Sequence, residues 1–86
     1  MNYVYLVISE KDESWYLGST SSLKRRIIEH NRGDSRYTNQ HRPYKLVYYE
    51  AYKNKRDASG RERYLKSGPG RHRLKEQLKN FLNERP

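Results

Sequence analysis

Hydrophobic and aromatic residues gather in short runs that polar segments separate, and the first two runs predict a hairpin. Residues Tyr3 to Ile8 are β-branched and aromatic, and Trp15 to Gly18 form a similar run after the polar residues 10–14. Runs of this length and composition are typical of β-strands. A third such run, from Lys45 to Tyr52, predicts a third strand.

The other apolar positions recur with helical spacing. Three segments show it: Leu23 to Asn31, Lys55 to Lys66, and Arg71 to Asn83, the last with the stripe Leu74, Leu78, Phe81 and Leu82. Ser21 or Ser22 can cap the first helix and Gly33 can end it, while Asn54 can cap the second. The second helix should end near residues 67–70. Residues Asp34 to Pro43 are polar and unpatterned, which predicts a loop.

The resulting order, ββαβαα, predicts an α+β fold with a small three-stranded antiparallel sheet flanked by helices. A chain of 86 residues can enclose only one hydrophobic core. We therefore expect residues 1–86 to form a single domain.

Two predicted helices carry polar side chains inside their apolar stripes. The stripes are Leu23, Arg26, Ile27 and His30 in the first, and Ala58, Arg61, Glu62 and Leu65 in the second. An Arg that reaches solvent and a structural His are the ordinary explanations for the first stripe. A carboxylate beside apolar neighbours is costly unless a cation or metal balances it. The simplest balance for Glu62 is an i, i+4 pair with Lys66.

The predicted hairpin places aromatic side chains on one face. If residues 11–14 turn tightly, Val7 lies opposite Gly18, and Tyr5 and Tyr16 share a face with Tyr3 and Gly18. Gly18 would then leave an open space diagonal to Tyr5, where a phosphate could approach. Half-buried strand aromatics are the ordinary interpretation of the tyrosines. Combined with the stripes, they supply the phenols, cation, imidazole and carboxylate that phosphodiester hydrolysis requires.

Charge and composition narrow the class of partner. Nineteen Lys and Arg against ten Asp and Glu give a net charge of +9, which favours polyanions such as nucleic acid or an anionic membrane surface. The sequence has no long apolar run and no signal-peptide pattern, so we expect a cytoplasmic protein outside the membrane. Without cysteine, a metal would be held by oxygen or imidazole ligands, which suits Mg²⁺ or Mn²⁺.

The order and spacing of these residues resemble the GIY-YIG nuclease superfamily over nearly the whole chain. Tyr3-Val4-Tyr5 is followed eleven residues later by Tyr16-Leu17-Gly18, as in the paired motifs that name the family. Arg26 lies eight residues after Gly18, and His30 lies four after Arg26. Residues 61–68 resemble the compact bacterial branch, in which the nuclease domain stands alone.

The resemblance has two departures, and neither removes a catalytic group. Tyr3 replaces the first Gly of the family's first motif, and Leu17 replaces the Ile of the second. The late Asn that some members carry after the glutamate helix has no match.

The resemblance implies a metal-dependent endonuclease. Tyr5 would act as, or relay to, the general base that activates water, and Tyr16 would position the nucleophile or a metal-bound water. Arg26 would hold the scissile phosphate, His30 would orient or protonate a neighbour, and Glu62 would bind a single Mg²⁺. Basic side chains outside this group are expected to contact the nucleic-acid backbone: Lys24, Arg25, Arg71, Arg73 and those of residues 34–43.

Two other functions fit the same residues. A noncatalytic nucleic-acid-binding module would use the basic surface and exposed tyrosines to grip phosphates and stack bases. An interaction domain that recruits a repair protein would show partners without cleavage. We expect an endonuclease acting on DNA, with a role in DNA repair, and a monomer with one active centre per chain.

Overall fold

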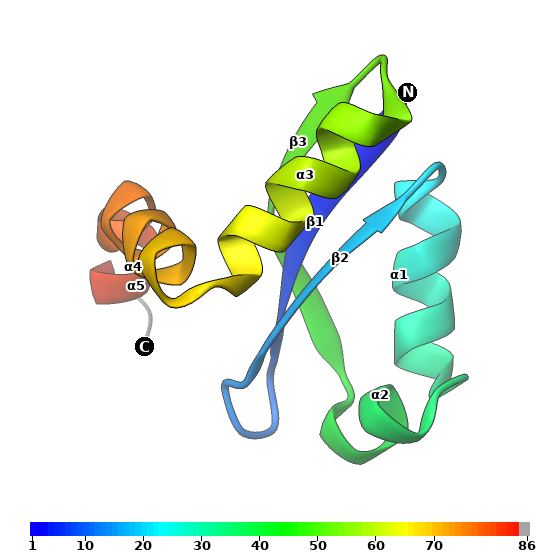
Figure 1. Ribbon diagram of the computed structural model, residues 1–86. Helices are drawn as coiled ribbons and strands as arrows, with labels where there is room; N and C mark the ends of the chain where they lie inside the picture. Colours follow the sequence, from blue (N-terminus) through cyan, green and yellow to red (C-terminus); the bar gives the residue numbers. More distant parts are fainter. Residues whose placement is uncertain (85–86) are drawn as a thin grey trace.

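The apolar run near the N-terminus forms the central strand of the sheet. The computed structural model describes residues 1–84, and its strands are β1 (Asn2–Ser9), β2 (Trp15–Thr20) and β3 (Tyr44–Tyr52). They are antiparallel in the order β2-β1-β3, so β1 pairs on both edges (Figure 1). This position explains why every residue from Val4 to Ser9 is buried.

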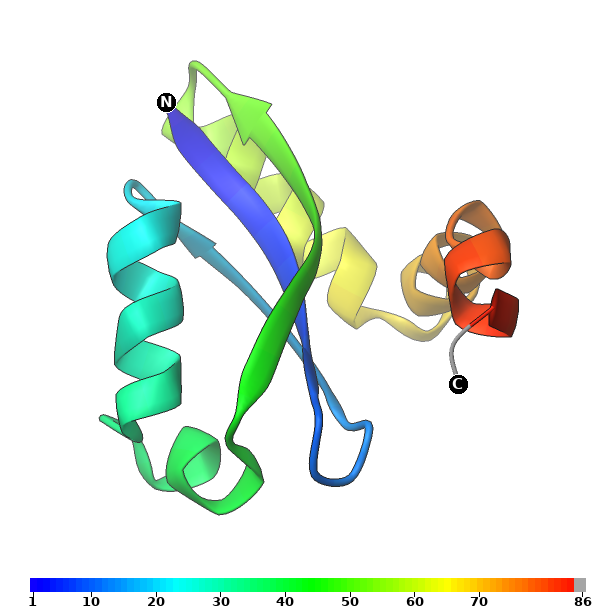
Figure 2. The same cartoon turned by 180° about the vertical axis from the view of Figure 1, so that it is seen from behind.

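Helices cover both faces of the sheet, as Figures 1 and 2 show from opposite sides. Alternation along β1 sends Val4, Leu6 and Ile8 to the face covered by α3 (Lys55–Lys66), and Tyr5 and Val7 to the face covered by α1 (Leu23–Arg32). The α+β fold with a three-stranded antiparallel sheet is therefore confirmed.

The helices α1 and α3 begin where the sequence predicts. Ser22 is the N-cap of α1, and Gly33 ends it with a φ of 76°, a left-handed conformation that glycine adopts without strain. The side chain of Asn54 caps α3 by accepting a hydrogen bond from the backbone N–H of Arg56. None of the helices in residues 1–84 is long and apolar enough to cross a membrane.

The predicted loop from Asp34 to Pro43 is wrong in part, because it contains the short helix α2 (Arg36–His41). Ser35 and Thr38 form a capping box, in which each side chain accepts a hydrogen bond from the backbone N–H of the other. Thr38 is also buried. Reciprocal capping and tertiary contact thus stabilise a helix that has no apolar stripe.

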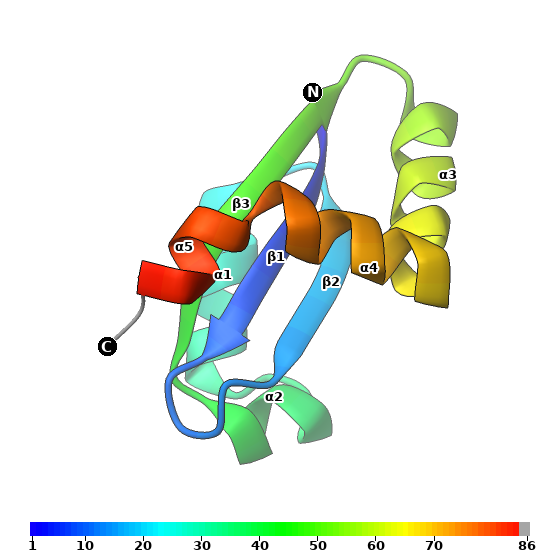
Figure 3. The ribbon, with the colours of Figure 1, turned by 90° about the vertical axis from the view of Figure 1, so that its left-hand side faces the viewer.

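The predicted last helix, Arg71 to Asn83, is two helices with an earlier start. The helix α4 (Gly68–Gln77) begins after Ser67, whose hydroxyl accepts a hydrogen bond from the N–H of Gly70. The chain leaves helical geometry at Leu78 and continues as α5 (Lys79–Glu84). These two helices lie across the face of the sheet opposite α1 (Figure 3).

This break also changes the predicted stripe. Leu74, Leu78 and Leu82 pack in or against the core, but Phe81 is 39% exposed. Leu82 therefore keeps to the apolar face beyond the break, and Phe81 is the member of the predicted stripe that departs from it.

The predicted register of the hairpin is shifted by two residues. Tyr5, not Val7, lies opposite Gly18, and Val7 lies opposite Tyr16. Residues 10–14 form a longer connection than a tight turn, with Glu13 at a φ of 62°. A shift of two residues keeps each side chain on its face, so Tyr5 and Tyr16 still lie together on the α1 side.

Candidate active site

A buried hydrogen bond joins β1 to α1 at the centre of the predicted site. The hydroxyl of Tyr5 lies 2.7 Å from Nε2 of His30, and both residues are at most 2% exposed. Alternation along β1 directs Tyr5 to this face, and the stripe of α1 directs His30 to meet it. A histidine in an apolar stripe here has a polar partner inside the core.

Burial drives the pKa values of this pair apart. Burial raises the pKa of Tyr5 to about 12, and the hydrogen bond and charge of Arg26 only partly oppose that rise. Burial lowers the pKa of His30 to about 4, and the nearby charge of Arg26 lowers it further. At neutral pH the phenol therefore keeps its proton and donates it to an uncharged imidazole.

Arg26 lies at the open side of the same pair. Its Nε is 3.4 Å from the Tyr5 hydroxyl, and its Nη1 donates to Glu29 Oε1 at 3.1 Å. The hydrogen bond to Tyr5 raises the pKa of Arg26, so the guanidinium is a permanent cation. Because its side chain is 38% exposed, a ligand in solvent can reach it.

Tyr16 completes an aromatic cluster around His30. The Tyr16 ring meets the His30 ring edge to face at a centroid distance of 4.6 Å, and Tyr5 lies 6.4 Å from Tyr16. Tyr16 is more exposed than Tyr5, so it is the outer of the two phenols. Tyr37 from α2 lies 5.7 Å from Tyr16 and is 42% exposed.

The expected open space at Gly18 is wrong, because the Tyr5 ring fills it. A Cβ at Gly18 would lie 2.6 Å from the Tyr5 hydroxyl and 2.9 Å from Cζ of the same ring. The register shift places Tyr5 directly across the ladder from Gly18 instead of diagonally. Gly18 therefore makes room for the Tyr5 phenol and not for a phosphate.

Glu62 lies on the opposite side of β2 from the aromatic cluster. Its Oε1 accepts a hydrogen bond from Ser19 Oγ at 2.7 Å, and its Oε2 pairs with Lys66 Nζ at 2.8 Å. Burial alone would raise the pKa of Glu62, but the hydrogen bonds from Lys66 and Ser19 outweigh it and lower the pKa. Its negative charge also contributes to the raised pKa of Tyr5, so the two groups interact electrostatically.

A neighbouring ion pair fixes the helix that carries Glu62. Arg61 Nε lies 3.0 Å from Glu50 Oε1 on β3, and the hydroxyls of Tyr48 and Tyr52 also donate to Glu50. The Arg61 side chain in the apolar stripe thus attaches α3 to the sheet. Because Arg61 precedes Glu62, this ion pair also fixes the position of the helix backbone next to Glu62.

Glu62 is a carboxylate that could hold a divalent cation whose other ligands are water and substrate. No group of three or more His, Asp or Glu side chains within residues 1–84 could enclose a metal. Magnesium ions in phosphoryl-transfer sites are often held by one or two carboxylates, with waters and phosphate oxygens as the other ligands. An ionised, 21% exposed carboxylate meets that requirement if Lys66 gives way.

The four basic residues expected to contact the backbone lie in different settings. Lys24 and Arg25 are exposed on α1, where Arg25 Nε lies 3.8 Å from Glu29. Arg71 on α4 lies over the Trp15 ring at 4.7 Å, and with Tyr16 and Lys66 it lines a shallow pocket. Arg73 is exposed on α4. Arg71 is therefore the one of the four that lines a pocket with a tyrosine of the predicted site.

Sequence reasoning missed Ser19 and Tyr37. Ser19 belongs to the polar residues that follow the second motif, and it was expected to lie beyond the strand rather than on it. Tyr37 lies in a segment expected to be a loop. Its place next to Gly18 is the one signal for Ser19. If the strand continues past Gly18, the side chain of Ser19 points to the face opposite that of Tyr5 and Tyr16.

The comparisons with known proteins place these residues in a family. A UPF0213 protein of Clostridium perfringens is 51% identical over 67 residues, which span 77% of this chain and 71% of that protein. The UPF0213 protein YazA of Bacillus subtilis is 39% identical over 66 residues, spanning 76% of this chain and 67% of that protein.

A solved relative has the same architecture. The solution NMR structure of a UPF0213 protein from Bacillus halodurans matches with a TM-score of 0.52 and 38% identity, over 94% of this chain and 85% of that one. The GIY-YIG catalytic domain matches residues 1–76, a range that includes Tyr5, Tyr16, Arg26, His30 and Glu62. The chain therefore belongs to the GIY-YIG catalytic domain family.

Proposed function

We propose that this protein is a metal-dependent endonuclease that hydrolyses phosphodiester bonds in DNA. Membership of the GIY-YIG family implies nuclease activity on nucleic acid. The observation that carries the finer proposal is the chain of hydrogen bonds from Arg26 through the Tyr5 hydroxyl to His30. It joins a phosphate-binding cation, a proton carrier and a proton acceptor.

Tyr5 acts in this mechanism as a proton relay and not as a pre-formed phenolate. With a pKa raised to about 12, Tyr5 holds its proton at neutral pH, and His30 presents a free nitrogen to it. The attacking water gives a proton to the Tyr5 oxygen as Tyr5 gives its own proton to His30 Nε2. No tyrosinate accumulates, so the raised pKa of Tyr5 is compatible with the reaction.

Arg26 binds the scissile phosphate and brings it to Tyr5. The Nε of Arg26 lies 3.4 Å from the Tyr5 hydroxyl, so a phosphate bound by the guanidinium would lie beside that hydroxyl. Its planar fork can hold two phosphate oxygens as negative charge develops on them. Tyr16, the outer phenol, positions the water.

Glu62 and Ser19 are the side chains that would hold Mg²⁺ or its water ligands. When bound there, the ion would stabilise negative charge on the leaving oxygen as a Lewis acid. Lys66 balances Glu62 in the absence of the ion. One carboxylate and one hydroxyl leave most ligand positions to water and to the substrate, so the ion would bind together with its substrate.

The test is Mg²⁺-dependent cleavage of labelled duplex, flap, junction and single-stranded substrates. An active endonuclease produces internal cuts that chelation by EDTA stops, and the preferred substrate identifies the nucleic-acid structure that is recognised. Binding without cleavage across the whole panel, with each divalent metal supplied, would replace this proposal with the noncatalytic binding module.

A further inference from the structure

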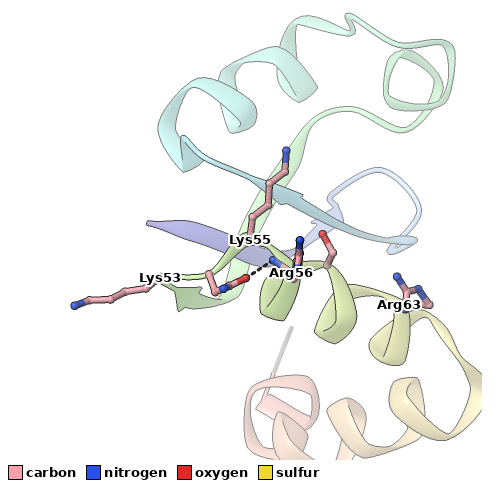
Figure 4. A pocket seen from close by; sticks show the side chains of 6 residues that line it. Lys53, Lys55, Arg56 and Arg63 are labelled. Atoms are coloured by element: carbon pink, nitrogen blue, oxygen red, sulfur yellow. Dashed lines mark hydrogen bonds between the residues drawn. The ribbon is translucent and has the colours of Figure 1, made fainter.

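Two adjoining hollows lie along α3, and Glu62 lines the second of them. The larger, of about 610 Å³, is lined by Lys53, Asn54, Lys55, Arg56, Ser59 and Arg63 (Figure 4). A second, of about 290 Å³, shares Ser59 and Arg63 with it and adds Glu62 and Lys66. Because they share two lining residues, the two hollows lie side by side along the helix, and we call them together the α3 groove.

The cations of the larger hollow are available to a ligand. Lys53, Lys55, Arg56 and Arg63 are exposed, and none has an ion-pair partner within residues 1–84. Other arginines of the long helices are already engaged, with Arg25 and Arg26 paired to Glu29, and Arg61 to Glu50. Solvation is the usual state of a surface cation, but four unpaired cations around one hollow form a concentrated positive site.

Helix geometry puts these side chains in two rows along α3, Lys55 with Glu62 and Arg56 with Arg63. Arg56 and Arg63 are seven residues apart, so they project from the same side two turns apart, with Ser59 between them. Figure 4 shows Lys55, Arg56 and Arg63 extending to the same side of α3. Lys55 precedes Glu62 by seven residues, about 10 Å along the helix axis. Phosphates of a strand that passes Glu62 would therefore meet Lys55 after about three nucleotides, with Arg56 and Arg63 in the neighbouring row.

We propose that the α3 groove binds the phosphate backbone of the substrate strand beside the cleavage point. This inference deepens the proposed function and rests on it for the identity of the ligand. Glu62 lies at one end of the groove, and Lys55 and Arg56 hold phosphates at the other. The groove adds affinity without base readout, because cations bind phosphates of any sequence.

The lining of the groove favours nucleic acid over an anionic membrane. Surfaces that bind membranes place apolar side chains beside their cations so that these side chains enter the bilayer. All six residues around the larger hollow are polar or charged. A phosphate chain needs only such groups.

The first experiment compares two triple variants with the same change in charge. Lys55→Gln with Arg56→Gln and Arg63→Gln removes three groove cations, and Lys11→Gln with Lys45→Gln and Lys79→Gln removes three cations from elsewhere. Binding of a labelled DNA duplex is measured in EDTA over a range of salt, so that no cleavage occurs. We expect the groove variant to bind DNA about tenfold more weakly than the control variant. The slope of the logarithm of its binding constant against the logarithm of the salt concentration should be shallower than that of the control by about 2 to 3.

The second experiment uses the absence of cysteine from the chain. Ser59→Cys introduces one thiol into the groove, and Asn80→Cys introduces one on α5. DNA should slow alkylation of the thiol at position 59 and leave the reaction at position 80 unchanged.

The outcomes separate this proposal from the proposed function. Equal loss of affinity in the two triple variants, or alkylation at position 59 that DNA does not slow, would overturn the groove. If DNA protects position 59 but no substrate is cut with Mg²⁺, the groove stands and the endonuclease proposal fails.

Discussion

The hydroxyl of Tyr5 lies 2.7 Å from Nε2 of His30, and the two side chains are buried together between β1 and α1. Burial raises the pKa of Tyr5 to about 12 and lowers that of His30 to about 4. The proton between them therefore rests on the phenol. A nuclease that uses this pair must move that proton during the reaction rather than before it.

The first prediction is that the His30 imidazole titrates near pH 4 instead of near its ordinary pKa of 6.5. Burial disfavours its charged form, and the charge of Arg26 adds to this effect. NMR titration of the three histidine rings measures it, with the His30 resonances assigned by their loss in His30→Gln. Titration of this ring near pH 6.5 would contradict the account of a buried, neutral acceptor.

The same shift predicts how His30 affects stability. Unfolding restores the ordinary pKa of His30, so between pH 6.5 and 4 the unfolded chain binds a proton that the native chain does not. The contribution of neutral His30 to the free energy of unfolding is therefore fully present above pH 6.5, and it is lost as the pH falls toward 4. The difference in unfolding free energy between wild type and His30→Gln should therefore change by about 3 kcal/mol across this interval. Urea denaturation of both proteins at several pH values measures this difference. The contributions of carboxylates cancel, because both proteins contain the same ones.

The second prediction concerns Arg26. Lysine keeps the charge and the aliphatic stem but lacks the planar fork that grips two phosphate oxygens. We expect Arg26→Lys to keep a near-normal Tm and DNA binding but to lose on the order of 10² in cleavage rate, about 3 kcal/mol. Single-turnover cleavage with saturating enzyme and Mg²⁺ measures this loss.

Arg32 provides the matched control, because it also lies on α1 with a carboxylate partner, Asp34, at 2.6 Å. Arg32→Lys should cleave at the wild-type rate. If Arg26→Lys and wild type cleave DNA at equal rates, Arg26 does not act as a phosphate clamp and is an ordinary surface residue.

The sequence predicted which elements form and which faces they share better than it predicted local detail. Periodicity placed Leu23 and His30 on one stripe, because side chains seven residues apart share a face of any helix. The register of Tyr5 against Gly18 depends instead on how residues 10–14 turn, which no apolar pattern encodes. The predicted register was wrong by two residues, so the shared face was correct. The space expected to be open at Gly18 holds the Tyr5 ring instead.

The helix α2 and the contacts of Glu62 were hidden for related reasons. A capping box normally shows Glu or Gln at its fourth position, and Thr38 takes that role here. Glu62 forms the expected pair with Lys66, but its bond to Ser19 requires a strand that continues past Gly18. The capping box is local but lacks the usual residue, whereas the bond between Glu62 and Ser19 depends on tertiary proximity, which a single sequence does not contain.

The third prediction tests the metal site. Glu62→Gln keeps the size of the side chain and its bond to Ser19 but removes the charge that a divalent cation needs. Cleavage should be lost, and binding of Mn²⁺, followed by its paramagnetic signal in the presence of DNA, should weaken. Glu76→Gln, at an exposed carboxylate on α4, is the control and should leave both unchanged. A Glu62→Gln protein that cuts at the wild-type rate would remove Glu62 from the site.

The last prediction compares two glycines that the structure places in opposite settings. A Cβ at Gly18 would lie 2.6 Å from the Tyr5 hydroxyl and 3.1 Å from Cε1 of Tyr16, whereas a Cβ at Gly60 meets nothing within 4 Å. Gly18→Ala must push the Tyr5 ring away from His30, which should destabilise the fold by about 1 to 3 kcal/mol and reduce cleavage more than DNA binding.

Gly60→Ala should instead stabilise the protein by about 0.5 to 1 kcal/mol, because alanine favours the interior of α3 and has room there. Urea denaturation and single-turnover cleavage of both variants measure these effects. If Gly18→Ala keeps the wild-type stability and rate, the phenol does not need its place above Gly18, and the proton relay through Tyr5 loses its structural basis.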